Sequence, residues 1–272
     1  MKFKRLLYLL LCFAGLAYGN TGGTDKETII INDINWPPYF MPKTNGGAIG
    51  LGKELITECL TQLNYPSQFK SLPIQRTHGY MKSGDIDLTV YSHKADRESF
   101  VYYGKEPIFS SEYGFAVKQG SGIQINKIAD IQSLIIGHLS GLSHTPEILS
   151  IIEQSRKVNK VREGYSVETM LAQLTAQPRQ FDILPNSKST LYWYSKVMGL
   201  SEQVTVLDYT VTTKNYFLTV SKKSKHIKSP TKFLGDMDLC LIKLKQSGKY
   251  HQILASYGFD LTAKELKKDI TH

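Results

Sequence analysis

A chain of 272 residues of which 41% are hydrophobic is large enough to bury a substantial core, which excludes a mainly disordered protein. The formal net charge of +9 favours anionic small molecules or an anionic membrane surface as partners. The densest lysine run, SKKSKHIK at Ser221–Lys228, is interpreted as a solvated turn, and we expect no nucleic acid partner because no clustered basic motif is present.

The N-terminus has the pattern of an export signal. Basic residues at positions 2, 4 and 5 precede the apolar run 6–17, which ends at Ala17-Tyr18-Gly19. This pattern predicts a cleavable signal peptide at residues 1–19 and a mature protein free in the periplasm. The run is shorter than the ~20 residues of a spanning helix, and the leucine before Cys12 makes a poor lipidation site.

Two cysteines, Cys59 and Cys240, remain after the signal peptide. An oxidising compartment permits a disulfide between them. Both lie at apolar positions of helical patterns, so we expect two separate buried thiols, with pairing as the alternative.

The chain then alternates between short β-branched strands and helices with an apolar stripe. The turn Trp36-Pro37-Pro38-Tyr39 interrupts the first strand pattern, since proline cannot continue a ladder, and Thr145 with Pro146 marks a helix start. In chain order, the sequence predicts strand 28–32, helix 51–63, strand 68–72, helix 74–81, strand 86–91, helix 96–101, strand 113–118, helix 128–132, strand 134–139, helix 146–155, strand 160–163, a helix from 166, strand 181–184, strand 216–220 and helices 231–246 and 249–258.

This order consists of two α/β units and a tail that repeats neither of them, which predicts two lobes with a cleft between them. Ligands of such sheets bind beyond the carboxyl ends of the strands. No zinc-ligand spacing, dinucleotide loop or P-loop occurs, and GLSHT lacks the second glycine of a nucleophile elbow. We therefore expect neither a metal nor a cofactor, and no enzyme activity.

Arg97 lies just past the predicted strand 86–91, and its planar guanidinium suits a carboxylate. Ser92 lies nearer still to the strand end and could add a hydrogen bond. The alternative is a surface arginine paired with Asp96 or Glu98.

Trp36 and Tyr39 follow the first strand at its carboxyl end, where their rings could stack on a ligand. The alternative is that these aromatic side chains close the rim of a core.

The order and spacing of these landmarks resemble those of the family 3 bacterial extracellular solute-binding proteins, the periplasmic receptors of polar amino acid ABC transporters. The resemblance covers nearly all of the mature chain. It implies a type II periplasmic binding fold, α/β in class, with two lobes joined by two hinge strands that close on a ligand, and a monomer. The matching segments are WPPYF, GLGKEL, SGDIDLTVYSHKADR, GHLSGLSH, QFDILPN and KLKQSGKYHQIL.

The resemblance also implies domain boundaries. The first lobe would comprise residues 26–115 and 213–262, and the second lobe residues 116–212. Residues 263–272 would form a C-terminal tail.

The resemblance assigns candidate ligand contacts residue by residue. Arg97 matches the arginine that grips the α-carboxylate, and Ser92 matches a neighbouring hydroxyl. Trp36 matches the aromatic residue that covers the ligand. Ser143 falls where the second lobe offers a hydroxyl at a helix start, whose free N–H groups also favour an anion.

The chain departs from the family pattern after the strand 181–184. The family has an aspartate there that holds the ligand's ammonium group, whereas this sequence has Asn186 and Ser187. The nearest acid, Asp182, belongs by the family pattern to the strand. A carboxylate ligand without an ammonium contact and an amino acid held by neutral oxygens both remain open. Arg76 resembles a subgroup pattern and could line the cleft or form a structural ion pair.

The resemblance predicts a solute-binding protein for ABC-type uptake of a small carboxylate-bearing metabolite. One alternative is an enzyme on the same scaffold, similar to the periplasmic cyclohexadienyl dehydratases. Another is a ligand sensor that docks to a membrane receptor in place of a permease.

Overall fold

The computed structural model describes residues 26–41, 48–72, 74–142 and 144–258. The predicted signal peptide 1–19, Ser143 and the tail 263–272 lie outside these residues.

The protein is an α/β protein built on one nine-stranded sheet with strand order β2-β1-β3-β9-β4-β7-β5-β6, while β8 pairs with β4. The strands are β1 Ile29–Asp33, β2 Ser67–Ser71, β3 Leu88–Ser92, β4 Val101–Lys118, β5 Ile136–Leu139, β6 Val161–Gly164, β7 Ile183–Ser187, β8 Val204–Val206 and β9 Thr212–Ser221. The helices are α1 Leu51–Gln62, α2 Ile74–Ser83, α3 Pro146–Lys157, α4 Val167–Thr175, α5 Lys188–Val197, α6 Pro230–Gln246 and α7 Lys249–Ser256, with short 3₁₀ helices η1 Ala95–Ser99 and η2 Ile128–Ser133.

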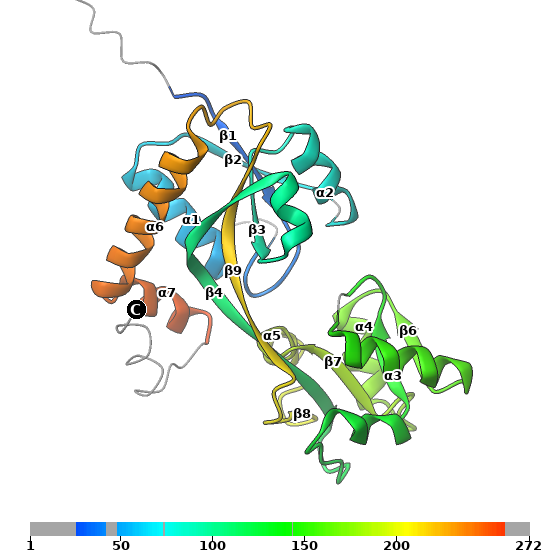
Figure 1. Ribbon diagram of the computed structural model, residues 1–272. Coiled ribbons are helices and arrows are strands. Elements are labelled where there is room, and N and C mark those ends of the chain that lie inside the picture. The colour runs from blue at the N-terminus through cyan, green and yellow to red at the C-terminus, as the bar shows by residue number, and fades with distance from the viewer. Residues whose placement is uncertain (1–25, 42–47, 73, 143, 259–272) are drawn as a thin grey trace, which may run out of the picture.

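The sheet has a parallel group of strands at each end and an antiparallel pair in the middle. Strands β2, β1 and β3 run parallel to one another, as do β7, β5 and β6. The long strands β4 and β9 pair antiparallel with each other and link the two groups, so that the chain forms two lobes joined by two hinge strands (Figure 1).

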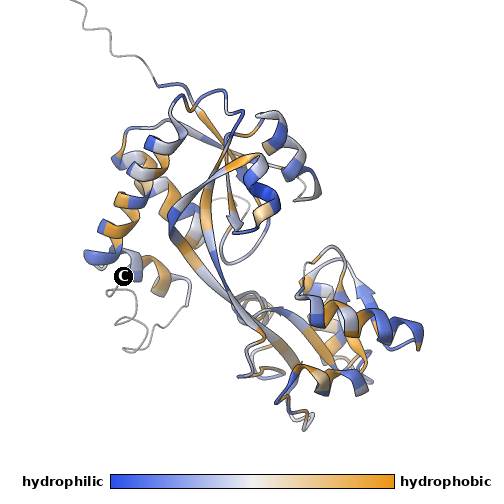
Figure 2. Ribbon diagram, in the orientation of Figure 1, coloured by the Kyte–Doolittle hydropathy of each residue, from blue (hydrophilic) through white to orange (hydrophobic). Residues whose placement is uncertain are grey.

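Each lobe has its own hydrophobic core. The clusters of the first lobe draw their buried residues from positions 29–109 and 216–257, and those of the second lobe from positions 115–206. Apolar residues follow the strands, whereas the segment around η1 is hydrophilic (Figure 2). The change from one set of clusters to the other falls between residues 109 and 115 and between residues 206 and 216. We therefore propose lobe boundaries near the expected 115/116 and 212/213, with Phe115 packed in the second lobe.

Strand β4 begins at Val101, well before the predicted start at residue 113. Its register against β9 shifts on both sides of Pro107, which cannot donate to a ladder. The carboxylate of Asp238 on α6 accepts the N–H groups of Lys105 and Glu106 at 2.9 and 3.1 Å. These bonds satisfy the backbone donors next to the register shift. The strand therefore continues through Pro107, a residue type that usually interrupts a strand.

The expectation of two separate thiols is wrong, because Cys59 on α1 and Cys240 on α6 form a disulfide. Their Cα atoms lie 5.7 Å apart, and 181 positions separate them in sequence. Both cysteines are buried in the first lobe's main cluster. The bond ties a helix near the N-terminus to one near the C-terminus, an association that has no local sequence signal.

The lysine-rich run 221–228 is a turn that one buried acid organises. Asp87, 0% exposed, accepts from the Ser224 hydroxyl at 2.6 Å, from the backbone N–H groups of Lys225 and His226, and from Ile30 N of β1. Burial opposes ionisation, but these hydrogen bonds keep the pKa of Asp87 below its ordinary value. The turn is therefore tied to the strands it follows.

None of the described helices combines the length and apolar character that a membrane span requires.

Candidate functional site

The pairing of β4 with its neighbours places several polar side chains on one face of the sheet where the lobes meet. Residues opposite each other in a ladder share a face, as do residues two apart along a strand. Ser111 is paired with Lys214, and Tyr113 with both Thr212 and Ser187. We call the face that carries Ser111, Tyr113, Ser187, Lys214 and Tyr216 the hinge face.

A chain of hydroxyl groups crosses the hinge face from one lobe to the other. The Tyr39 hydroxyl lies 2.7 Å from that of Ser189, which lies 2.7 Å from that of Ser187. Ser187 in turn lies 2.8 Å from the hydroxyl of Ser111. The Thr190 hydroxyl donates to the Pro37 carbonyl at 2.9 Å, which adds a second bond between the turn after β1 and α5.

Aromatic rings form a wall beside this chain. Tyr39 stacks on Phe109 with ring centroids 4.1 Å apart, and Trp36 lies edge-on to Tyr216 at 4.8 Å. The hydroxyl of Tyr216 lies 3.2 Å from that of Tyr113. Burial raises the pKa of both tyrosines. These rings therefore present neutral hydroxyl groups at ordinary pH.

Arg97 is held by groups of its own lobe, and none of the described acids forms an ion pair with it. Its Nη1 donates to the Ser92 carbonyl at 2.8 Å, and its guanidinium carbon lies 4.5 Å from the Tyr91 ring centroid. Of the two acids expected as alternative partners, Glu98 bonds to His93 at 2.7 Å. Within the described part of the chain, no ion pair joins Arg97 to Asp96, Glu98 or another carboxylate. The guanidinium is thus fixed in place with its charge unmatched.

Further cations lie around Arg97. Lys214 places its Nζ 5.2 Å from the Tyr113 ring centroid. Burial, followed by repulsion from Lys94 and Arg97, lowers the pKa of Lys214. His144, 7% exposed, has its pKa lowered to about 4 by burial and by the charges of His138 and Lys214. Lys214 on β9 thus lies within electrostatic range of Arg97 in the first lobe and of His144 in the second lobe. We call the surroundings of these three residues the electropositive region.

The other predicted residues take varied positions. The Ser92 carbonyl, and not its hydroxyl, contacts Arg97. Tyr39 is 1% exposed, so its ring belongs to the core, as the alternative expectation had it, and only its hydroxyl reaches the interlobe network. Trp36 is half-buried against the same core.

The sequence suggested that Asn186 and Ser187 follow a strand that ends at residue 184. In the structure they are instead the last two residues of that strand, β7. The buried Oδ1 of Asn186 accepts from Ser187 N at 2.7 Å, while its Nδ2 is buried and unpaired. Asp182 accepts from Ile135 N at 2.8 Å at the start of the same strand, away from the hydroxyl chain. Arg76 is exposed on α2, and no described carboxylate forms an ion pair with it. Ser143, as noted, is outside the described residues.

Sequence reasoning missed Ser111, Ser189 and Lys214. Ser111 and Lys214 lie in strand segments that were not predicted, and Ser189 lies in the unpredicted helix α5. The alternation in TTKNYFLTV, in which Lys214, Tyr216 and Leu218 share a side, was the one available signal.

Two other kinds of site were compared with the hinge face, a metal site and a surface hollow. Across the described residues, no cluster of three or more metal-ligating side chains is present. A surface hollow of about 500 Å³ between β4 and α6, lined by Lys105, Asp238 and Leu239 among others, shares no residue with the hinge face. The hinge face itself combines neutral hydroxyl groups, aromatic rings and the positive charge of Lys214, which has no described ionic partner.

Comparison with known proteins gives a family and several structural relatives. The model of the bacterial extracellular solute-binding proteins, family 3, matches residues 28–260. No curated protein matches the chain in sequence.

Three similar solved structures show the range of proteins with this fold. A histidine kinase sensor domain with similarity to periplasmic binding proteins has a TM-score of 0.66 at 15% identity and covers 86% of this chain and 96% of its own. An ancestral arginine-binding protein bound to arginine has a TM-score of 0.65 at 18% identity, covering 85% and 97%. An ABC uptake transporter substrate-binding protein from Streptococcus pneumoniae with bound histidine has a TM-score of 0.65 at 17% identity, covering 87% and 94%. The two-lobed fold and the match over 28–260 lead to one conclusion: the chain belongs to the bacterial extracellular solute-binding proteins, family 3.

Proposed function

We propose that the protein is a periplasmic solute-binding protein that captures a small carboxylate-bearing metabolite between its lobes for ABC-type uptake. The observation that carries this proposal is the state of Arg97. The Ser92 carbonyl and the Tyr91 ring fix its guanidinium, and no described carboxylate neutralises it. A preorganised guanidinium without an acid suits a carboxylate ligand, because a charge-assisted bidentate pair is stronger than a neutral hydrogen bond.

Three further features support the proposal. Among the described residues, the side-chain bonds Tyr39–Ser189 and Thr190–Pro37 join the two lobes, and the two β-strands that link them can act as a hinge. The solved relatives named for arginine and histidine are binding proteins of the same fold. The N-terminal pattern of residues 1–19 favours export.

A binding role is favoured over an enzyme on the same scaffold. A dehydratase needs a general acid beside its substrate. The last two positions of the second-lobe strand β7 carry Asn186 and Ser187 and no acid, and the serines of the hinge-face network bond to one another. We therefore propose no catalytic residue.

One observation favours a second candidate function. A histidine kinase sensor domain shares the fold at a TM-score of 0.66. The same ligand capture could thus report to a membrane sensor, and pull-down with a permease or a sensor from the native membrane distinguishes the two.

Isothermal titration of the mature protein with amino acids and small carboxylates tests the proposal. Arg97→Gln is expected to lower the affinity of any carboxylate ligand by about 2 kcal/mol or more, because a buried charged contact is lost. Arg162→Gln is a matched control, since Arg162 Nη1 also donates to a backbone carbonyl, Asn159 O at 2.8 Å, but on an exposed strand. Unchanged affinity in Arg97→Gln would show that the arginine is not the anchor.

A further inference from the structure

We infer that the ligand carries a second anionic group in addition to its carboxylate, and that Lys214 on hinge strand β9 binds this group. The inference rests on the proposed function, which it makes more specific: the substrate class is a small doubly anionic acid without an ammonium group.

The position of Lys214 carries the first step. Its ladder partner is Ser111, whose hydroxyl belongs to the chain that links the lobes. Two residues along β9, Tyr216 contacts the aromatic wall and lies within electrostatic range of Arg97. Lys214 therefore projects from the same face as the hydroxyl network, on a strand that belongs to the hinge.

The charge of Lys214 is not neutralised by the protein. No described side chain forms a hydrogen bond or ion pair with its Nζ, which lies over the ring of Tyr113. The acid nearest along the ladder, Glu112, lies on the opposite face of β4 and is paired with Lys188 at 3.5 Å.

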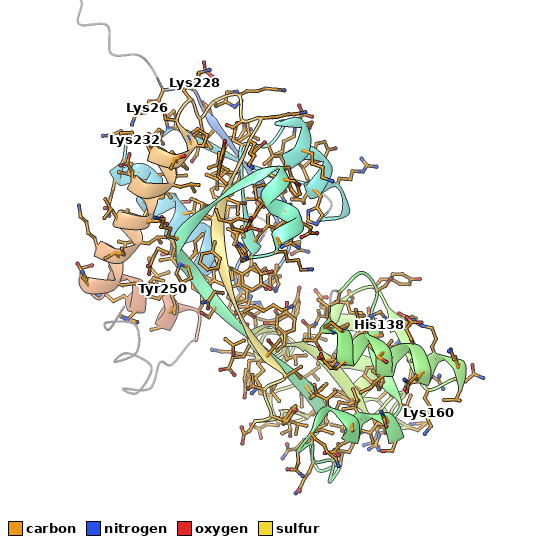
Figure 3. The ribbon with its side chains drawn as sticks, in the orientation of Figure 1. Lys26, His138, Lys160, Lys228, Lys232 and Tyr250 are labelled. Carbon is orange, nitrogen blue, oxygen red and sulfur yellow. A yellow bond between two sulfur atoms is a disulfide. The ribbon has the colours of Figure 1, made fainter. Side chains whose placement is uncertain are left out.

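Three exposed lysines of the first lobe differ from the half-buried Lys214 because each has a polar partner. Lys26, Lys228 and Lys232 lie at the far end of the first lobe (Figure 3), and their Nζ atoms contact Leu63 O, Glu27 and Asp236 respectively. An unmatched lysine that is half-buried beside two other cations costs stability. Such an arrangement is expected where a ligand supplies the missing negative charge.

Unpaired polar atoms give an independent indication of a ligand. Arg97 Nε and the Nε2 atoms of His138 and His144 are buried, and no described group bonds to them. The two histidine rings, 5.3 Å apart, lie on the second-lobe side of the electropositive region. Buried polar atoms without partners are rare in proteins. Arg97 Nε can only donate, so it points to an acceptor on the ligand.

The acids of the second lobe near this region are already engaged: Glu163 bonds to His138 at 2.8 Å and pairs with Arg156. The Oδ1 of Asn186 is already bonded to Ser187 N, and Asp182 is bonded to Ile135 N and Arg179. An ammonium ligand would face the two cations Arg97 and Lys214. A dicarboxylate, or a carboxylate that carries a phosphonate or phosphate, matches the charge instead.

The experiment uses pairs of compounds that differ by one charge. Isothermal titration of the mature, ligand-free protein compares succinate with butanoate, which lacks the second anion, and succinate with L-aspartate, which adds an ammonium group. Glutarate and 3-phosphonopropionate test chain length and the type of anion. We expect a doubly anionic compound to bind at least about tenfold more tightly than butanoate, and L-aspartate to bind no better than succinate.

Substitutions then test Lys214 itself. Lys214→Met should weaken binding of the doubly anionic compound by about tenfold or more and leave butanoate unchanged, while Lys214→Arg should retain most of the affinity. Lys222→Met is the matched control, because Lys222 also lies on an aromatic ring, Tyr102 at 5.2 Å, but beyond the other end of β9. It should leave binding unchanged.

Each outcome bears on the inference. If butanoate binds as tightly as the dianions, or if Lys214→Met has no effect on binding of the dianions, the inference is wrong while the proposed function stands. If none of these compounds binds, both the proposed function and the inference are contradicted. If Lys214→Met fails to fold, the wild-type preference between succinate and butanoate and the binding of Lys214→Arg still decide the question.

Discussion

The hydroxyl of Tyr39 lies 2.7 Å from the hydroxyl of Ser189, so that a core residue of the first lobe bonds directly to the second lobe. The ring of Tyr39 is fixed by its stacking on Phe109. The bond therefore holds the first turn of α5 against a rigid surface, and with the Thr190–Pro37 bond it sets how the lobes meet beside the hinge strands.

Removing this hydroxyl should weaken the interface without disturbing the core. Tyr39→Phe keeps the ring, so we expect a loss of about 1 kcal/mol in the free energy of unfolding, the usual contribution of one hydrogen bond. Urea denaturation measures it, with Tyr165→Phe, at an 88% exposed position, as the control. Equal stability of the two variants would mean that Tyr39 and Ser189 are not bonded in solution.

The disulfide between Cys59 and Cys240 should contribute strongly to the stability of the first lobe. A cross-link over 181 positions restricts the unfolded chain, and the entropic estimate for such a loop is about 5 kcal/mol as an upper value. We expect the reduced protein, or Cys59→Ala/Cys240→Ala, to unfold at clearly lower urea concentration. The double variant should no longer respond to reductant. Two free thiols in denatured, unreduced protein would contradict the bond.

Local patterns predicted much of the fold. Strand β1 was found from its β-branched run, and α3 from Thr145, whose side chain accepts from Ile148 N as an N-cap. Helix α5 was missed because its sequence, KSTLYWYSKV, mixes aromatic and polar residues without a clear stripe. The early half of β4 was missed because Pro107 reads as a break, and only Asp238, far away in the sequence, makes a strand possible there.

The candidate site was only partly predictable for a related reason. Arg97 follows a strand end closely, so its position could be inferred from the local pattern. Lys214 and Ser111 are brought together by the ladder between β4 and β9, and Tyr39 and Ser189 by the meeting of the lobes. Such relationships depend on strand register and domain packing, which short sequence segments do not encode.

His144 should make stability depend on pH in mildly acidic solution. Its pKa is lowered to about 4 from the ordinary value of 6.5, first by burial and then by His138 and Lys214. Between these values the unfolded chain binds more protons than the folded protein, so the free energy of unfolding falls as the pH drops, by at most about 1.4 kcal/mol per pH unit. His144→Gln should show a shallower fall between pH 6.5 and 4, measured by urea denaturation at several pH values. The exposed His93→Gln should follow the wild type, and the same slope in all three proteins would rule out this role of His144.

Lys214 should lower the stability of the unliganded protein, a consequence that is independent of any ligand. Its pKa is depressed by burial and by the cations Lys94 and Arg97, which means that its charged form is less favourable in the folded state than in the unfolded chain. Lys214→Met keeps the unbranched stem beside Tyr113 and removes the charge. We therefore expect a thermal midpoint about 2 °C higher, since ~1 kcal/mol shifts the midpoint by about 2–4 °C in a protein of this size. Differential scanning calorimetry at low ionic strength measures the gain, which salt should reduce by screening the repulsion. Lys222→Met provides the control, because Lys222 makes the same kind of ring contact away from Arg97. A lower midpoint for Lys214→Met would show that the charge is compensated in the free protein and that stability is not given up for ligand binding at this position.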